Sequence, residues 1–325
     1  MASSPLKVGQ CLKGKLGIYT ITKRLYPTTW LATDATSQTV VIKRDISKRI
    51  DTERTLLRRF PDTNSFFRPV IDEIEEEPRR PDQSAAAIVL KHYDCHVGEI
   101  AKEKGLSPRE ARYVGSCVLQ ALCALHAIGY IYTGLFYVKP ANILVNRCQQ
   151  DGGEMMRFRD VCLADLGDAL STDSIEATSG HPYGTPVFRS PEATLMMPFT
   201  TAHDIWSFGA TLISLLYGRN FSVFSPACIK PEDELYVDGI VRNFHKYFGP
   251  FPPSYLTLAG IDEERLEALT NITEEGKDRG LFKRASSAEI SNQDRDFIWS
   301  LMKLDHRDRP TAAELLEHEW FADLD

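Results

Sequence analysis

The sequence GTPVFRSPE occupies residues 184–192, and the sequence DIWSFG follows it at residues 204–209. The second stretch opens a run, residues 204–216, in which nearly every side chain is apolar. A helix that is apolar all round packs in the interior of a protein rather than on its surface. The middle of the chain therefore predicts a helix buried on most sides, preceded by an irregular segment.

The chain before this run has the alternating pattern of strands. Alternation of apolar and polar residues predicts half-buried strands, whereas a 3.6-residue spacing predicts a helix. The expected strands are residues 19–22, 30–33, 39–43, 66–77 and 85–90, and residues 51–60 are expected to form a helix. Five strands and one helix make a small β-rich lobe.

The rest of the chain has mainly helical patterns. Residues 108–128 predict a long helix, and Ser107 is a suitable N-cap for it. Amphipathic helices are expected at residues 294–304 and 311–321, whereas the charged stretch 262–288 is expected to be irregular surface structure. The fold class is therefore α+β, with a larger, mainly helical lobe after the small one.

Four further motifs occur in an order that is typical of one family. They are VIK at residues 41–43, KPAN at 139–142, LADLG at 163–167 and HRDRPT at 306–311. Together with GTPVFRSPE they resemble the motifs of the eukaryotic protein kinase family. The resemblance covers about residues 18–321, so it implies a single protein kinase domain.

The resemblance implies a bilobal fold and a Ser/Thr type of kinase. Residues 1–17 would be an N-terminal extension, 18–91 the N-lobe and 92–325 the C-lobe, with the nucleotide cleft near residues 90–94. The Lys-Pro-x-Asn pattern is similar to that of Ser/Thr kinases, and YFGPFP at residues 247–252 resembles SR-protein and cyclin-dependent-like kinases.

The family resemblance assigns a cofactor-binding role to five residues of the N-lobe and its exit. Lys43 would hold the α- and β-phosphates of ATP, with Glu53 as its ion-pair partner. Leu90, His92 and Tyr93 lie where the segment between the lobes would contact the nucleotide. The interval from Lys43 to Glu53 is shorter than the family pattern, so the intervening loop or helix is trimmed.

The same resemblance assigns catalytic and metal-binding roles to residues of the C-lobe. Lys139 would contact the transferred phosphoryl group, and Thr185 belongs to the segment that docks the substrate. Asn142 and Asp165 would hold Mg²⁺. GTPVFRSPE is the most specific match in the chain, and its docking segment indicates a peptide rather than a small-molecule substrate.

The resemblance also implies a structural ion pair between Glu192 and Arg309. Arg309 follows the tripeptide His-Arg-Asp at residues 306–308. This tripeptide lies after every phosphate-handling motif, so it is not the catalytic loop.

The catalytic loop itself departs from the family pattern. Residues 129–144 read GYIYTGLFYVKPANIL, so Gly134 stands at the position of the catalytic base, the aspartate of His-Arg-Asp. Residues 135–138 fill a gap that normally holds one residue. The glycine-rich loop is also absent, because residues 26–29 read YPTT and proline removes an amide donor.

Three interpretations of this pattern stay open. The chain is a pseudokinase or strongly impaired kinase that binds ATP and Mg²⁺ weakly, or it is an active Ser/Thr protein kinase. In the third interpretation, residues 134–138 are misassigned coding sequence and the true loop carries aspartate. Competence as an enzyme is therefore uncertain from the sequence.

Composition bounds the partners and the compartment. The chain has 325 residues, a net charge of −7 and 43% hydrophobic residues, and its pI is about 5.7. We expect no nucleic-acid partner, and a protein substrate or protein partner instead. Seven dispersed cysteines indicate a reducing compartment, cytoplasmic and/or nuclear. No apolar run is long enough for a membrane span, and the oligomeric state stays unknown.

Overall fold

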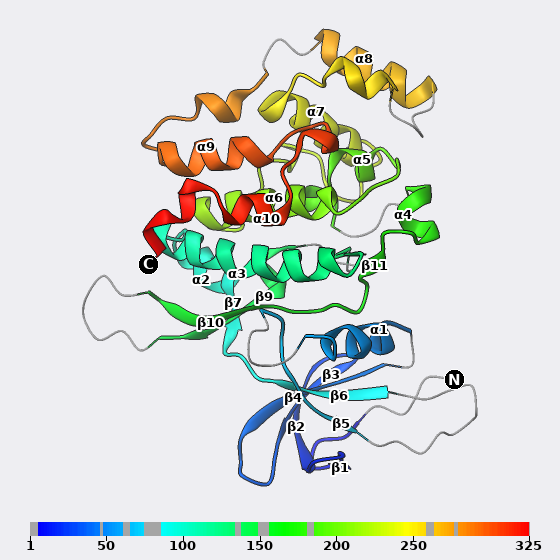
Figure 1. Cartoon of the computed structure of the whole chain (residues 1–325), viewed down its shortest axis with the longest axis vertical. Coiled ribbons are helices and arrows are strands. Elements are labelled where there is room, and N and C mark those ends of the chain that lie inside the picture. Colours follow the sequence, from blue (N-terminus) through cyan, green and yellow to red (C-terminus); the bar gives the residue numbers. More distant parts are fainter. Residues whose placement is uncertain are drawn as a thin grey trace. The chain divides into compact units, whose positions relative to one another are not determined.

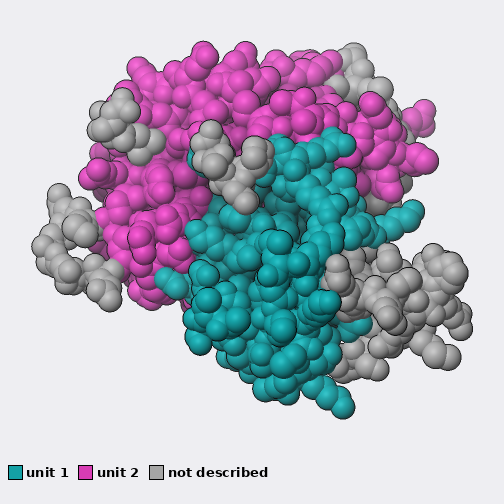
Figure 2. All heavy atoms as spheres, turned by 60° about the horizontal axis from the view of Figure 1, so that its bottom comes forward, with its two compact units in different colours: residues 1–94, 162–169 teal, residues 95–161, 170–325 magenta. Residues whose placement is uncertain are grey.

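A computed structural model describes residues 6–45, 48–60, 66–74, 86–133, 138–148, 156–180, 185–257, 263–275 and 279–324. The chain divides into two compact units, which Figure 2 distinguishes by colour. Unit 1 comprises Met1–Asp94 and Cys162–Ala169, and unit 2 comprises Cys95–Val161 and Leu170–Asp325. Unit 1 is built around a β-sheet and unit 2 is mainly helical (Figure 1), so the α+β, bilobal fold expected from the sequence is confirmed.

Unit 1 contains one antiparallel sheet of six strands in the order β1-β2-β3-β4-β6-β5. The strands are β1 (Cys11–Lys13), β2 (Ile18–Tyr26), β3 (Thr29–Thr33), β4 (Thr39–Asp45), β5 (Val70–Ile74) and β6 (Ala86–Lys91). Trp30 and Ala32 alternate with less buried neighbours on β3, as a half-buried strand requires. Helix α1 (Lys48–Leu57) turns Glu53, Leu56 and other residues into the interior.

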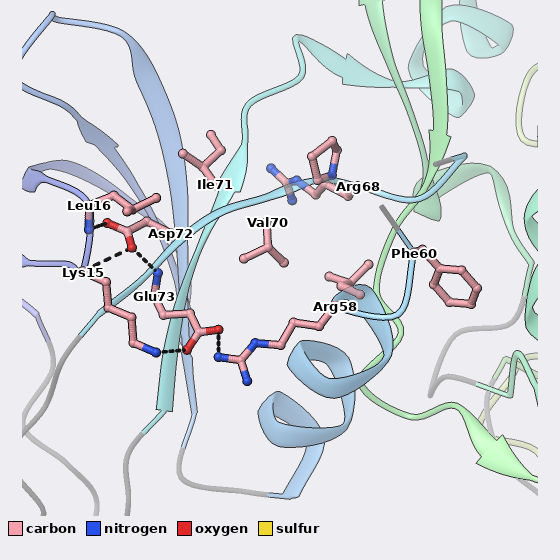
Figure 3. Close-up of a pocket in the computed structure, with 11 residues that line it drawn as sticks. Lys15, Leu16, Arg58, Phe60, Arg68, Val70, Ile71, Asp72 and Glu73 are labelled. Carbon is pink, nitrogen blue, oxygen red and sulfur yellow. Dashed lines mark hydrogen bonds and ion pairs between the residues drawn. The ribbon is translucent and has the colours of Figure 1, made fainter. Parts of the chain in front are cut away.

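The two edges of this sheet are joined through Asp72 on β5. Its carboxylate accepts hydrogen bonds of 2.9–3.1 Å from the backbone N–H groups of residues 15–17. It also accepts a bond of 3.0 Å from the Tyr19 hydroxyl. Gly14 pairs with Ile74 in an antiparallel bridge. The turn between β1 and β2 is therefore fixed to the opposite edge of the sheet (Figure 3).

This arrangement adds a sixth strand to the five that the sequence predicted. The segment expected to be an N-terminal extension, residues 1–17, contains β1, and its Leu6 and Leu12 side chains are buried in the core of the sheet. The difference arises because the contacts of Asp72 join residues more than fifty positions apart. A local hydrophobic pattern does not report such contacts.

Residues 162–169 belong to unit 1, although residues 95–161, which precede them in the chain, belong to unit 2. The N–H of Leu163 donates to the carbonyl of Phe66 at 2.7 Å, and the N–H of Arg68 donates to the carbonyl of Leu163 at 3.1 Å. Phe67 forms a parallel bridge with Leu163. A boundary drawn at one point of the sequence, such as 91/92, therefore separates residues that share one unit.

Unit 2 contains helices and short strands. Its helices are α2 (Val97–Glu103), α3 (Pro108–Ala127), α4 (Ile175–Ser179), α5 (Pro191–Thr194), α6 (Ala202–Tyr217), α7 (Tyr236–Phe248), α8 (Glu263–Glu275), α9 (Asn292–Leu301) and α10 (Ala312–Leu316). The 3₁₀ turns used below are η1 (Pro140–Asn142), η2 (Pro186–Phe188) and η5 (His306–Asp308). The strands are β7 (Cys95–His96), β8 (Tyr130–Ile131), β9 (Ile143–Arg147), β10 (Phe158–Leu163), which ends in unit 1, and β11 (Leu170–Ser171).

Helix α6 is the buried helix that the apolar run predicted. Every residue from 203 to 215 is buried. Trp206 packs against the rings of Phe224, Phe244 and Phe248, with centroid distances of 5.2–5.9 Å. Because the side chains of α6 are packed on all sides, this helix is a rigid element to which other segments of unit 2 can be attached.

Two other helices, α3 and α8, show where local sequence patterns predict a helix correctly and where they do not. Helix α3 begins after Ser107, whose hydroxyl accepts from the N–H of Glu110, while the Glu110 carboxylate accepts from the N–H of Ser107. This capping box confirms the predicted N-cap. In contrast, the expectation of irregular structure at residues 262–288 is wrong, because α8 forms there and buries Leu269 and Ile272.

No helix in the described part of the chain combines the length and hydropathy that a membrane crossing requires.

Candidate functional site

Three charged side chains of unit 1 meet where the sequence predicts phosphate binding. The Lys43 Nζ on β4 lies 2.5 Å from the Glu53 Oε2 on α1 and 2.5 Å from the Asp165 Oδ1. Glu53 is buried, whereas the side chains of Lys43 and Asp165 remain 20% and 22% exposed. The trimmed interval between Lys43 and Glu53 therefore still allows the pair to form.

The protonation of this cluster is governed by burial and by mutual attraction. Burial alone would lower the pKa of Lys43, but the carboxylates of Glu53 and Asp165 outweigh it and the pKa is raised. The pKa of Glu53 is raised because burial and the Asp165 charge together exceed the effect of Lys43. One ammonium thus serves two carboxylates, and the three residues carry a formal charge of −1 when all are ionised.

The segment that carries Asp165 has an unusual backbone. Asp165 has a φ of 65°, in the left-handed region that aspartate tolerates better than most residues. At Gly167 a Cβ atom would lie 3.2 Å from the carbonyl oxygen of Arg49, so glycine fits best there. Arg49 Nη2 lies 2.5 Å from Asp168 Oδ2, which fixes the segment to α1. Sequence analysis missed this pair.

The predicted cofactor-binding residues Leu90, His92 and Tyr93 lie at and after the end of β6. The Leu90 side chain is buried, and His92 and Tyr93 are partly buried. Burial and the nearby cation of Arg68 lower the pKa of His92. Arg68 Nε also donates a hydrogen bond of 2.8 Å to the carbonyl oxygen of Lys91. Sequence analysis did not single out Arg68, although a cation within the apolar stretch 66–71 was a visible signal.

The turn that replaces a glycine-rich loop contains only Pro27 and Thr28, between β2 and β3. Its two carbonyls already have partners, since Arg24 Nη2 donates to Pro27 O at 3.0 Å and the Arg44 N–H donates to Thr28 O at 2.9 Å. Pro27 has no N–H group. The turn therefore offers few amide donors to a phosphate.

In unit 2, helix α6 holds Tyr132 and Val138, the two ends of residues 132–138, which are called the catalytic-loop segment below. Asp204 Oδ2 accepts a hydrogen bond of 2.8 Å from the Tyr132 N–H, and His126 Nε2 lies 2.8 Å from the same oxygen. The Thr211 hydroxyl donates to the Val138 carbonyl at 2.5 Å. Gly134, the predicted base position, lies outside the described residues.

Lys139 directly precedes the 3₁₀ turn η1, and Asn142 is the last residue of that turn. The Asn142 N–H donates to the Lys139 carbonyl at 2.9 Å, and the side chain of Asn142 is mostly buried while that of Lys139 is partly exposed. Thr185 is the residue before η2 and is partly buried. These three residues belong to unit 2, whereas Lys43 and Asp165 belong to unit 1.

The predicted ion pair between Glu192 and Arg309 is confirmed. Two parallel hydrogen bonds of 2.7 and 2.8 Å join the guanidinium to the carboxylate, and neither side chain is exposed. The remaining N–H groups of Arg309 donate to the carbonyls of Ala202, Lys303 and Leu304. All five donors of the arginine are therefore used.

Burial would raise the pKa of Glu192, but Arg309 outweighs it and lowers the pKa to about 2. Burial has the opposite consequence for His203, whose pKa falls to about 4 although Asp204 and Glu192 attract its proton. The Ser190 Oγ lies 2.7 Å from His203 Nδ1. The His-Arg-Asp tripeptide at residues 306–308 forms the turn η5. Arg309, which directly follows it, belongs to this buried network and not to a phosphate site.

A surface cavity of about 390 Å³ lies elsewhere on unit 1, between β5 and the end of α1. Its apolar lining includes Leu57 and Phe60. At its rim Glu73 pairs with Lys15 at 3.1 Å and with Arg58 (Figure 3). None of the sequence-predicted site residues lines this cavity. Among the described residues, no three His, Cys, Asp or Glu side chains cluster as a metal site of their own.

Comparison with known proteins agrees with the geometry. The protein kinase domain family matches residues 38–321. The chain is 26% identical to mitogen-activated protein kinase 12 of Rattus norvegicus over 241 residues, which is 73% of this chain and 57% of that protein. It is 25% identical to cyclin-dependent kinase F-4 of Oryza sativa subsp. japonica over 293 residues, covering 87% of this chain and 56% of that one.

A third relative is the probable casein kinase II subunit alpha homolog of Encephalitozoon cuniculi, which is 27% identical over 210 residues, or 63% of this chain and 57% of the relative. The chain thus spans a little over half the length of these curated relatives. The family match covers most of the chain and includes every predicted site residue. The chain therefore belongs to the eukaryotic protein kinase family.

Proposed function

We propose that this chain is an ATP-binding pseudokinase or a strongly impaired Ser/Thr kinase. The observation that carries the proposal is the assembled cluster of Lys43, Glu53 and Asp165 in a chain whose residue 134 is glycine. The cluster supports nucleotide binding, and the glycine argues against efficient transfer.

The protein kinase family uses ATP and Mg²⁺. The Asp165 carboxylate and the Asn142 amide supply the oxygen donors that Mg²⁺ prefers, so these residues fit the ion and would hold it. Bound there, the ion would neutralise phosphate charge. Lys43 would contact the α- and β-phosphates, and Leu90, His92 and Tyr93 would contact the base. Binding is weak in this proposal because the turn at Pro27 and Thr28 offers few amides.

The catalytic part of the proposal rests on position 134. A glycine has no side chain to orient a substrate hydroxyl or to accept its proton, and such a base contributes about 10²–10⁴-fold to the rate. Lys139 would still contact the transferred phosphoryl group, and Thr185 would still border the docking segment. The protein then acts mainly by binding a protein partner.

The alternative is an active Ser/Thr protein kinase that transfers the γ-phosphate to a protein substrate. The retained Lys43, Glu53, Asn142 and Asp165 favour it, as does the anchoring of Tyr132 by α6. Both versions assign one kinase domain to about residues 18–321. Both also assign the protein to the cytoplasm and/or nucleus, as its dispersed thiols suggest.

The test combines thermal stability with a phosphotransfer assay. ATP at millimolar concentration should raise the melting temperature of the protein more with Mg²⁺ than without it. Asp165→Asn should remove the Mg²⁺-dependent part, whereas Asp296→Asn, at an exposed position, should not. Peptide phosphorylation should be barely detectable.

Two outcomes would count against the proposal. If ATP with Mg²⁺ produces no shift, nucleotide binding is lost and the protein acts as a scaffold alone. If the unaltered protein phosphorylates peptides at ordinary kinase rates, and Asp165→Ala abolishes that activity, the active-kinase alternative replaces the pseudokinase.

A further inference from the structure

The candidate metal ligand Asp165 belongs to a short segment of unit 1, residues 163–168, that begins at the last residue of β10. The first end of the segment is held by the N–H of Leu163, which donates to the carbonyl of Phe66 at 2.7 Å. Asp165 has left-handed backbone, with a φ of 65°, and follows the end of the strand. The direction of its carboxylate therefore depends on what fixes the rest of the segment.

The second end of this segment is fixed to helix α1. The Arg49 Nη2 lies 2.5 Å from the Asp168 Oδ2, and the two side chains are 36% and 18% exposed. The backbones also approach closely, because a Cβ atom at Gly167 would lie 3.2 Å from the Arg49 carbonyl oxygen and 3.4 Å from the Arg49 Cβ. A close backbone approach and an ion pair thus join the end of the segment to α1.

Two residues on one face of α1 reach this segment. Arg49 and Glu53 are four positions apart, and residues at that spacing lie on the same side of a helix. Glu53 reaches Asp165 through the shared Lys43, whose Nζ lies 2.5 Å from each carboxylate. Arg49 reaches Asp168 directly. The segment is therefore linked to α1 once through a shared lysine and once by a direct ion pair.

The position of Arg49 does not favour the helix itself. It is the second residue of α1, where the helix dipole presents partial positive charge and disfavours another cation. The carboxylate of Asp168 compensates for this charge from outside the helix. In contrast, Arg54 pairs with Asp51 within α1. The cation of Arg49 is therefore better explained by the segment that it binds than by the stability of the helix.

The two links would respond differently to a bound nucleotide. In the proposed function, Lys43 contacts the α- and β-phosphates and Asp165 contacts Mg²⁺. Lys43 would then share its charge with phosphate, so the link from Glu53 to Asp165 would weaken. The pair of Arg49 and Asp168 uses neither of these two groups. It can keep the segment on α1 while Lys43 and Asp165 exchange partners.

We propose that Arg49 and Asp168 are positioning residues, whose ion pair holds the Asp165 carboxylate in place for Mg²⁺. The inference rests on the proposed function, because it requires Asp165 to hold the ion. It deepens that function by assigning part of the metal affinity to two residues that touch neither the ion nor the nucleotide. Outer residues that orient a metal ligand contribute about 10–100-fold to metal affinity.

The experiment follows the melting temperature of the protein during an ATP titration, once with Mg²⁺ and once with EDTA, and so yields an apparent ATP affinity. Arg49→Met and Asp168→Asn should each weaken ATP binding with Mg²⁺ by about 10-fold, the lower end for such residues, and leave it unchanged with EDTA. The double variant of Arg49→Asp with Asp168→Arg should recover most of the loss, because it restores the pair with its charges reversed.

Arg54→Met is the matched control, because it removes an arginine of similar exposure from the same helix. It should leave ATP affinity unchanged in both conditions. Without nucleotide, the melting temperatures of Arg49→Met and Asp168→Asn should fall no further than that of Arg54→Met. This comparison keeps a folding defect apart from an effect on the metal.

The possible results separate this inference from the function on which it rests. Equal losses of affinity with Mg²⁺ and with EDTA would overturn the positioning role, because the whole site would then have been disturbed. Unchanged affinity in both single variants, or no recovery in the charge-reversed protein, would also overturn it and leave nucleotide binding by the unaltered protein intact. The absence of any ATP-induced shift in the unaltered protein would overturn the proposed function together with the inference.

Discussion

Two groups of charged residues in this protein use the same chemistry for different ends. In unit 2, Glu192 and Arg309 are wholly buried and every donor of the arginine is used. In unit 1, Lys43 is shared between Glu53 and Asp165 and stays partly exposed. A closed pair has no capacity for a ligand, whereas a shared cation can exchange a carboxylate for another anion. Full burial and complete use of its donors therefore mark the pair in unit 2 as structural, whereas a shared and partly exposed cation marks the cluster in unit 1 as a candidate binding site.

Removing one member of the closed pair should have the largest effect on stability. We predict that Arg309→Met lowers the free energy of unfolding by about 3–5 kcal/mol, because Glu192 would be left buried and charged. Chemical denaturation measures this loss. Asp296→Asn, which breaks an exposed pair with Arg295, is the control and should cost less than about 1 kcal/mol. Equal losses in the two variants would mean that the buried pair of Glu192 and Arg309 contributes no more to stability than an exposed pair.

The closed network should also make stability depend on pH through His203. Its pKa is about 4 in the folded protein against 6.5 ordinarily, so the unfolded chain takes up a proton first as the pH falls. Stability should therefore decrease between pH 6.5 and pH 4, by at most about 1.4 kcal/mol per pH unit from this group. Denaturation curves of His203→Asn should show a flatter dependence. An unchanged slope would assign the effect to other groups.

Repair of the catalytic loop tests whether the open cluster can still support phosphotransfer. Replacing residues 134–138 by Asp-Val should raise peptide phosphorylation by at least about 10²-fold, the contribution of a positioned base. The cluster of Lys43 and Asp165 would already stabilise the transferred charge. The same repair combined with Asp165→Asn is the control and should give no gain. No gain in the repaired protein itself would identify the turn at Pro27 and Thr28 as the limiting defect.

The smallest effect is expected when the open cluster loses its cation. Lys43→Met should lower the free energy of unfolding by less than about 2 kcal/mol, because Glu53, whose pKa is already raised, can take up a proton instead of remaining charged. Denaturation at neutral pH measures the loss beside Arg309→Met. If Lys43→Met destabilises as much as Arg309→Met, the cluster is as structural as the closed pair.

Local patterns predicted those parts of the molecule that depend on neighbours in the sequence. The capping box at Ser107 and the buried helix α6 follow from spacing alone. The pair of Glu192 and Arg309 was predicted only because the family resemblance supplied its partners. Helix α8 was missed, since its charged sequence hides the two residues, Leu269 and Ile272, that it buries.

Contacts between distant residues could not be predicted in this way. Asp72 closes the sheet by accepting from residues 15–17, and nothing near Asp72 in the sequence indicates those donors. Arg68 reads as one more polar residue until its bond to Lys91 is seen. In both cases a polar side chain owes its role to the fold that surrounds it.

The two bonds from α6 to the catalytic-loop segment have a consequence for how this protein could evolve. Asp204 holds Tyr132 and Thr211 holds Val138, so each flank of the segment is fixed independently. A lineage can therefore lengthen or substitute residues 134–137 under weak selection while the flanks keep their places. A change in the sequence or length of residues 134–137 would then leave both anchoring bonds in place and cost little in folding stability.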